Sequence, residues 1–303
     1  MQTAQESDTF EITVSLVGEL IAEQFPQWEH LPIKPVELSG HDNRTFRLGD
    51  DMSVRLPSAQ RYAAKVAKEQ QWLPFLAPHL SLPIPKPLAM GQPSKNYPWH
   101  WSIYSWIEGT SANVLIIDDS KLPLIASQLA QFLRELQKID ATDVPLVGGP
   151  HNFYRGDSTK VYDAQTRSAI DQLHGVIDTK AATAVWEKSI SSEWSKNPVW
   201  IHGDISAGNI IIKENKLAAV IDFGGMGIGD PACDLVIAWT FFKNESRNIF
   251  KSHVNLDSDT WARARGWALW KALITLASLQ DKTCPEAMRQ KQIIDEIIKE
   301  SHH

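Results

Sequence analysis

Three oxygen-bearing side chains stand at short, defined spacings between residues 198 and 223. Asp204 follows an apolar run, Asn209 comes five positions later, and Asp222 follows a second apolar run. Transfer of a phosphoryl group needs a carboxylate beside the attacking hydroxyl and hard oxygen ligands for Mg²⁺, which neutralises phosphate oxygens. We therefore expect Asp204 to accept the proton of a substrate hydroxyl, and Asn209 and Asp222 to bind Mg²⁺.

The residues between these side chains make the pattern specific. The chain reads His202-Gly-Asp204, then four residues and Asn209, then a hairpin pattern, and then Asp222-Phe-Gly224. An aspartate five residues before an asparagine is common by chance, whereas the whole string matches the catalytic loop and metal motif of kinases. We expect His202 to brace the loop rather than to act as an acid or base.

A further acidic motif, Gly229-Asp-Pro-Ala-Cys-Asp234, follows the metal motif. Together the motifs resemble those of the aminoglycoside phosphotransferase family, and the resemblance extends from about residue 31 to residue 279. Gly203 favours this small-molecule branch, because protein kinases usually have arginine at that position. The resemblance implies the same roles for Asp204, Asn209 and Asp222. It also implies a mainly structural role for Asp230 and Asp234, with Asp234 bracing the catalytic loop by hydrogen bonds.

The resemblance further implies a bilobal, α+β fold of the protein-kinase type. The residue pattern agrees with it, since strands surround one helix in the first part of the chain and helices dominate afterwards. We expect residues 1–107 to form a small, β-rich, nucleotide-binding N-lobe. Residues 108–303 should form a larger, mostly helical C-lobe that carries catalysis and acceptor binding.

The N-lobe must supply a cation for the phosphates of ATP, or of GTP in its place, and a carboxylate that orients this cation. Arg55 stands where the family often has lysine, and Glu69 on the following helix is its expected partner. Arginine keeps the charge but differs from lysine in length and geometry. Lys65 and Lys68 therefore remain alternative phosphate ligands.

Two backbone segments complete the expected nucleotide site. The loop containing Ser39, Gly40 and Asn43 precedes the two strands that lead to Arg55, and its N–H groups are expected to cover the phosphates. The segment around residues 102–109 resembles the hinge between kinase lobes. There the carbonyl of Ser105 and the N–H of Ile107 are expected to bind the adenine ring.

Periodicity and turn residues predict the elements that carry these sites. In the N-lobe we expect helices over 10–25 and 59–76, strands over 45–48, 52–56 and 99–106, and no regular element in the proline-rich run 78–93. In the C-lobe we expect helices over 121–139, 162–174, 181–195, 231–242, 258–279 and 285–300, and a hairpin of strands over 209–213 and 217–222.

The acceptor site should involve residues 150–195 and the C-terminal helices. Five acidic residues there could bind a polyamine, although acids at such positions are more often solvated: Asp257, Asp259, Glu286, Asp295 and Glu296. Three tryptophans at helical spacing favour core packing over an aromatic wall for a sugar or cation: Trp261, Trp267 and Trp270. Arg263 and Arg265 would repel a cationic acceptor, and instead suit an anionic acceptor or nearby acids.

Bulk composition narrows the class of protein. A net charge of −6 in 303 residues argues against a nucleic-acid partner. The N-terminus lacks the pattern of a signal peptide, and the longest apolar stretch is too short to span a bilayer. Two cysteines cannot make a disulfide framework or a zinc site. We therefore expect a cytoplasmic protein without a membrane partner.

The motifs predict an O-phosphotransferase that acts on a small hydroxylated molecule. The family resemblance implies an aminoglycoside-like acceptor and a role in antibiotic resistance. The same chemistry could serve a macrolide, an amino alcohol or an endogenous sugar, because different sites are built on one fold. A nucleotide-binding pseudokinase is the non-enzymatic alternative. It would require damage at the base or metal positions, all of which are intact.

Overall fold

The computed structural model describes residues 10–37, 40, 42–142, 144, 149 and 152–301. The chain divides into two compact units: residues 1–109 with 219–224, and residues 110–218 with 225–303. A boundary drawn along the sequence near residue 107 could not anticipate the short segment 219–224, which returns to the first unit. This segment carries Asp222.

The first unit contains a five-stranded antiparallel sheet in the order β1-β2-β3-β5-β4. Its strands are β1 (Ile33–Pro35), β2 (Asn43–Leu48), β3 (Met52–Pro57), β4 (Pro87–Gly91) and β5 (Trp101–Ser105). The two expected strands around Gly49 and the strand near residue 101 are confirmed. The proline-rich run 78–93, predicted to lack regular structure, contains β4. An edge strand tolerates proline at its first residue because that residue need not donate to a neighbour.

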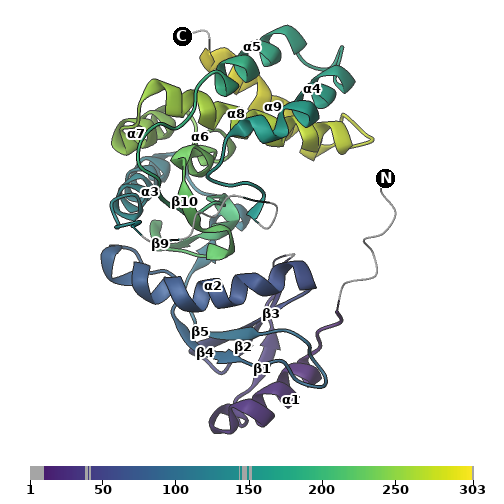
Figure 1. Ribbon diagram of the computed structural model, residues 1–303, viewed down its shortest axis with the longest axis vertical. Coiled ribbons are helices and arrows are strands. Elements are labelled where there is room, and N and C mark those ends of the chain that lie inside the picture. The colour runs from purple at the N-terminus through teal and green to yellow at the C-terminus, as the bar shows by residue number, and fades with distance from the viewer. Residues whose placement is uncertain are drawn as a thin grey trace. The chain divides into compact units, whose positions relative to one another are not determined.

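Strand alternation divides the sheet into two faces with different chemistry. Helix α1 (Val14–Gln24) covers one face, where its apolar residues join Val54 and Ile103 in a buried core. Helix α2 (Gln60–Leu76) covers the other face (Figure 1). Arg55 and Tyr104 alternate with those core residues along β3 and β5, so their side chains point to the α2 side.

The second unit is mainly helical. Its helices are α3 (Leu122–Leu136), α4 (Asp163–Gln172), α5 (Thr179–Ile190), α6 (Ile237–Thr240), α7 (Asn244–Val254), α8 (Ser258–Ser278) and α9 (Pro285–Ser301). Helix α8 packs against α4, α5 and α9, and α3 packs against α7 (Figure 1). Helix α7 was not predicted, because few of its residues are apolar and only Phe250 and Val254 supply a buried apolar face. The helix predicted over 231–242 is a 3-10 helix, η9 (Pro231–Leu235), followed by α6.

The segments that carry the catalytic and metal motifs lie between short strands. Strand β7 (Val199–Ile201) pairs with β10 (Gly227–Gly229), and the order β6-β8-β9 joins β6 (Thr110–Ser111), β8 (Ile210–Lys213) and β9 (Lys216–Val220). The predicted hairpin is confirmed, with a two-residue turn in which Glu214 and Asn215 both have positive φ. In the part of the chain that the structure covers, no helix has both the length and the apolar character needed to cross a bilayer.

Candidate active site

The loop after β7 places Asp204 and Asn209 together. Asp204 is exposed, and its backbone N–H donates to Nδ1 of the buried His202 over 3.2 Å. The amide nitrogen of Asn209 donates to Asp204 Oδ2 at 3.1 Å and to the Asp204 carbonyl at 2.9 Å. An accessible carboxylate, held on one side by a neutral amide, has the form of a hydroxyl-directed base. His202 braces the loop, as its sequence context predicted.

Asp234 stabilises this loop through hydrogen bonds to its backbone. It lies on η9, and its two carboxylate oxygens accept the backbone N–H groups of His202 and Gly203 at 2.7 Å each. Burial raises the pKa of the Asp234 carboxyl, although His202, these two bonds and the charge of Arg155 act to lower it. The expected bracing role of Asp234 is therefore confirmed. A buried carboxylate that satisfies two loop amides fixes the backbone on which Asp204 stands.

The glycine between His202 and Asp204 is a steric requirement. Gly203 has a φ of +82°, and a Cβ there would lie 2.3 Å from the carbonyl oxygen of Gly225. Any side chain at this position would strain the backbone and displace residue 225. By contrast, a Cβ at Gly208 in the same loop would approach nothing closer than 3.7 Å, at the Asn113 side chain.

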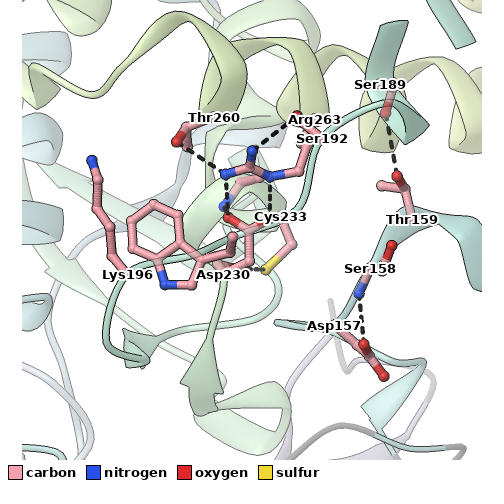
Figure 2. Close-up of polar contacts among 12 residues, drawn as sticks. Asp157, Ser158, Thr159, Ser189, Ser192, Lys196, Asp230, Cys233, Thr260 and Arg263 are labelled. Carbon is pink, nitrogen blue, oxygen red and sulfur yellow. Dashed lines mark hydrogen bonds and ion pairs between the residues drawn. The ribbon is translucent and has the colours of Figure 1, made fainter. Parts of the chain in front are cut away.

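Asp230, the other acid of this motif, forms a buried ion pair with Arg263 of α8 (Figure 2). The Nε–Oδ2 distance is 2.6 Å, and Arg263 also donates to Ser192 and Thr260. Burial raises the pKa of Asp230 more than Arg263 lowers it. Asp230 Oδ1 accepts the N–H of Ala232 and so caps η9. Asp230 is thus structural, as predicted, and Arg263 meets a nearby acid.

In the first unit, Arg55 lies between two carboxylates. Its guanidinium donates to Asp222 Oδ1 at 3.2 Å and lies 3.8 Å from Glu69 Oε1. Burial acts to lower the pKa of Arg55, but Asp222 and Glu69 outweigh it and raise the pKa. The predicted neighbours Arg55 and Glu69 are therefore brought together, and Asp222 joins them. Asp222 has a φ of +64°, a costly backbone state for a residue other than glycine.

Glu69 is held by a residue that the sequence analysis missed. The hydroxyl of Tyr104 donates to Glu69 Oε2 at 2.6 Å, while the buried Oε1 has no hydrogen-bond partner among the described residues. Burial raises the pKa of Glu69, and Arg55 acts against this rise. The position of Tyr104 could have been inferred from strand alternation, which puts it on the same face of the sheet as Arg55.

The two other candidate cations also lie on α2. Lys65 Nζ lies 2.6 Å from Asp42 Oδ2, so it links the helix to the predicted phosphate-covering loop. A Cβ at Gly224 would lie 2.9 Å from Lys65 Cδ, which places the lysine stem against the metal motif. Burial lowers the pKa of Lys68 to about 8, while Glu69 acts to raise it. Asp42 was not singled out by the sequence, because a lone loop aspartate carries no pattern.

The remaining residues that are predicted to bind the nucleotide are expected to do so through their backbone N–H and carbonyl groups. Gly40 is exposed and its carbonyl accepts a bond from Arg44, whereas Asn43 begins β2 opposite Pro57. Ser105 ends β5, its N–H donates to the Lys86 carbonyl at 3.0 Å, and Ile107 follows in an irregular segment. Ser39 lies outside the described residues. The expected nucleotide contacts of these residues stay predictions.

The two side chains predicted to bind Mg²⁺, Asn209 and Asp222, each offer a hard oxygen rather than a thiolate or an imidazole. The Asn209 amide nitrogen is bound to Asp204, so the amide oxygen is the atom left to a cation, and the Asp222 side chain is 37% exposed. Among the described residues no group of three or more His, Cys, Asp or Glu could hold a metal. Mg²⁺ commonly takes one or two protein oxygens together with phosphates and water.

Most of the acids considered for a polyamine acceptor are engaged with the protein. Asp257 caps α8 and lies 2.6 Å from Lys196 Nζ, Asp259 lies 3.9 Å from Lys188 Nζ, and Glu296 pairs with Arg247. The three tryptophans are buried, as core packing predicted: Trp261, Trp267 and Trp270. Arg265 lies 3.7 Å from Glu300.

A sequence model described as the phosphotransferase enzyme family, APH, matches residues 32–267. An aminoglycoside 3'-phosphotransferase of Escherichia coli is 28% identical over 189 residues, which cover 59% of this chain and 64% of that protein. One of Salmonella typhimurium is 32% identical over 125 residues, which cover 38% of this chain and 42% of that protein. The chain thus spans less than two thirds of the length of either relative.

Solved structures share the fold over nearly the whole chain. The GDP and kanamycin complex of the aminoglycoside phosphotransferase APH(2")-IIIa is 21% identical with a TM-score of 0.70, covering 95% of this chain and 99% of that one. The macrolide 2'-phosphotransferase MphH of Brachybacterium faecium is 17% identical with a TM-score of 0.59, covering 93% and 98%. These likenesses confirm the expected α+β, kinase-like fold.

Proposed function

Because the chain belongs to the phosphotransferase enzyme family, we propose that it transfers the γ-phosphate of ATP or GTP to a hydroxyl of a small molecule, with Asp204 as the general base. The observation that carries this proposal is the catalytic loop. Asp204 is exposed, and its loop is held by hydrogen bonds that involve Asn209, His202 and Asp234. A rigid loop that leaves one carboxylate accessible suits proton removal from an acceptor.

Asn209 and Asp222 are proposed to hold Mg²⁺ through the amide oxygen and the carboxylate. When bound, the metal would neutralise phosphate oxygens. The Arg55–Asp222 contact at 3.2 Å, within the first unit, supports a phosphate site beside the metal carboxylate, because an arginine there can also reach phosphate. Glu69, fixed by Tyr104, would orient Arg55.

The nucleotide is proposed to bind through Arg55 and through the backbone of the loop at Gly40 and Asn43, with the ring at Ser105 and Ile107. GDP and ADP are named in structures that share the fold, which supports a purine nucleotide as co-substrate. Aminoglycosides and macrolides are the first acceptors to test, since the relatives and structural neighbours are named for them.

The test is consumption of ATP or GTP with Mg²⁺ in the presence of aminoglycosides, macrolides and small hydroxylated metabolites. We expect nucleotide consumption that depends on an acceptor and is lost in Asp204→Asn. Nucleotide binding without acceptor-dependent turnover across all classes would contradict the proposal and favour a pseudokinase. Turnover by Asp204→Asn at the wild-type rate would remove Asp204 as the base.

A further inference from the structure

A half-buried arginine in the second unit, Arg155, makes no hydrogen bond through its guanidinium to any described residue, and no ion pair either. The guanidinium carbon lies 5.0 Å from the ring centroid of Trp267 and 5.8 Å from that of Trp270. Its planar fork therefore rests on an aromatic floor and keeps its donors available.

Other arginines over aromatic rings in this protein are bonded to the protein as well. Arg47 lies 4.0 Å over Trp106 and also donates to the carbonyl of Asp50. Arg263 lies 5.7 Å over Trp194 and is held by Asp230. Arg155 differs because, among the described residues, its guanidinium has ring contacts and a longer-range attraction to the buried Asp234, whose pKa it acts to lower, but no hydrogen bond. A guanidinium has five donors in a fixed fork, and a structural role would ordinarily satisfy some of them.

Three aromatic rings pack against one another at this site, and one of them carries a buried N–H donor. The ring of Tyr162 stacks on Trp270 at 3.8 Å, and Trp267 meets both rings edge-on. The buried indole N–H of Trp267 has no hydrogen-bond partner in the part of the chain that the structure describes. Buried donors are almost always satisfied, and this one belongs to the ring against which the Arg155 guanidinium lies.

The turn that carries Arg155 is strained and firmly anchored. Phe153 and Tyr154 both adopt positive φ, at 57° and 54°, although neither is glycine. The hydroxyl of Tyr162 donates to the Phe153 carbonyl at 2.9 Å, and the Asn152 side chain donates to the Arg155 carbonyl at 3.3 Å. Strain that the surrounding contacts maintain is typical of ligand-binding turns.

The same turn lies against the elements of the catalytic loop. The carbonyl of Gly156 accepts the N–H of Asp230 at 2.9 Å, and a Cβ at Gly156 would lie 2.8 Å from Ile201 Cδ1 on β7. Strand β7 leads directly to His202 and Asp204. Arg155 also acts to lower the pKa of Asp234, so it lies near the acid that braces the loop of the proposed general base.

We propose that Arg155, on the floor of Tyr162, Trp267 and Trp270, binds an oxyanion of the acceptor, either a carboxylate or a phosphate. This inference rests on the proposed function and assigns it a class of acceptor: a small hydroxylated molecule that carries a negative charge. A guanidinium fork matches both oxyanions in a bidentate manner and repels ammonium groups. The engagement of Asp257, Asp259 and Glu296 with lysine or arginine is consistent with an acceptor that is not a polycation.

Binding of four related sugars tests the proposal without requiring turnover. Glucose, glucosamine, glucuronate and glucose 6-phosphate share a hexose frame and differ in charge. Each is titrated by calorimetry into the full-length protein with ADP and Mg²⁺ at constant ionic strength. We expect glucuronate or glucose 6-phosphate to bind about 10-fold or more tightly than glucose and glucosamine, as a charge-assisted hydrogen bond allows. The tighter of the two anions identifies the oxyanion.

Two variants and a control complete the test. Arg155→Gln should abolish the preference for the anion, and Arg155→Lys should keep part of it because the charge remains without the fork. Lys180→Gln, which removes an exposed positive charge on α5, should leave the preference unchanged. Thermal melting checks that the variants are folded.

Either of two results would overturn the inference: wild-type protein that binds glucosamine as tightly as the anions, or folded Arg155→Gln that keeps the preference for an anion. Nucleotide binding is measured in the same preparation to separate the two proposals. Loss of ADP, ATP and GTP binding in the wild type counts against the proposed function. Normal nucleotide binding without a preference for an anion counts against this inference alone.

Discussion

Replacing Arg263 should destabilise the protein far more than replacing its neighbour Arg265 on the same helix. The side chains of Arg263 and Asp230 are only 3% and 4% exposed. Arg263→Met would leave a buried carboxylate without its counter-charge, which costs about 3–5 kcal/mol. For a domain of this size that corresponds to a fall in Tm of about 6–20 °C.

Arg265→Met is the matched control. Arg265 is 17% exposed, and its contact with Glu300 at 3.7 Å is too long for a hydrogen bond. Its replacement by another unbranched side chain on α8 should cost about 1 kcal/mol or less. Urea unfolding at pH 7 gives the free energy of unfolding for both variants and for wild type.

The pH dependence follows from Asp230. Burial raises the pKa of this carboxyl in the folded protein, so its ionised form destabilises the fold at higher pH. Loss of Arg263 raises that pKa further, and protonation at lower pH removes the uncompensated charge. The difference between Arg263→Met and wild type should therefore shrink as the pH falls. The double variant with Asp230→Asn should recover part of the loss. Equal costs for Arg263→Met and Arg265→Met, or a difference that grows as the pH falls, would refute the reasoning.

Three further predictions concern the proposed active site. Gly203→Ala should lower both Tm and kcat, because its Cβ would lie 2.3 Å from a backbone oxygen. Gly208→Ala is the control and should leave Tm and kcat near wild type. Similar effects of the two substitutions would contradict the steric account. Arg55→Ala should raise the nucleotide KM about 10-fold or more with a smaller change in kcat, and an unchanged KM in steady-state kinetics would remove Arg55 from the phosphate site. Lys68→Met should stabilise the protein at pH 7, because burial depresses the pKa of Lys68 to about 8 and the charged form is therefore disfavoured in the folded state. In urea unfolding this gain should shrink between pH 8 and about pH 10, where the native wild type loses a proton that the unfolded chain keeps; a gain that does not change with pH argues against the burial.

Residues whose chemistry is local to one segment could be predicted from the sequence. The order of His202, Asp204 and Asn209 within eight positions defines a loop, and the structure ties these residues to one another. The bracing role of Asp234 also followed from its motif. Such patterns are readable because short spacings restrict where the side chains can lie.

Partners that meet across elements could not be predicted in the same way. The bond from Tyr104 to Glu69 and the pair of Lys65 with Asp42 depend on how α2 packs on the sheet and on the loop before β2. Arg263 had several acids within plausible reach, and only the packing of α8 on η9 selects Asp230. Tertiary packing decides such pairs, and a single sequence does not encode them as a spacing.

The prediction of helices and strands was wrong where the local sequence pattern was ambiguous. The run of prolines before Gly91 hid β4, since proline is compatible with an edge strand but not with a central one. Helix α7 has a mostly polar surface, so its buried Phe250 and Val254 were too few to reveal a period. Longer helices with many buried apolar residues, such as α3 and α8, were placed correctly.

The most direct test of the account follows the phosphate itself. Wild-type protein and Asp204→Asn are mixed with ATP labelled at the γ-phosphate, Mg²⁺ and an acceptor found in the turnover screen, under single-turnover conditions. We predict that the label appears in the acceptor with wild type and that Asp204→Asn transfers it ~10²–10⁴-fold more slowly with unchanged nucleotide binding. Transfer of the label by Asp204→Asn at the wild-type rate, or release of the label only as inorganic phosphate by the wild type, would contradict the account.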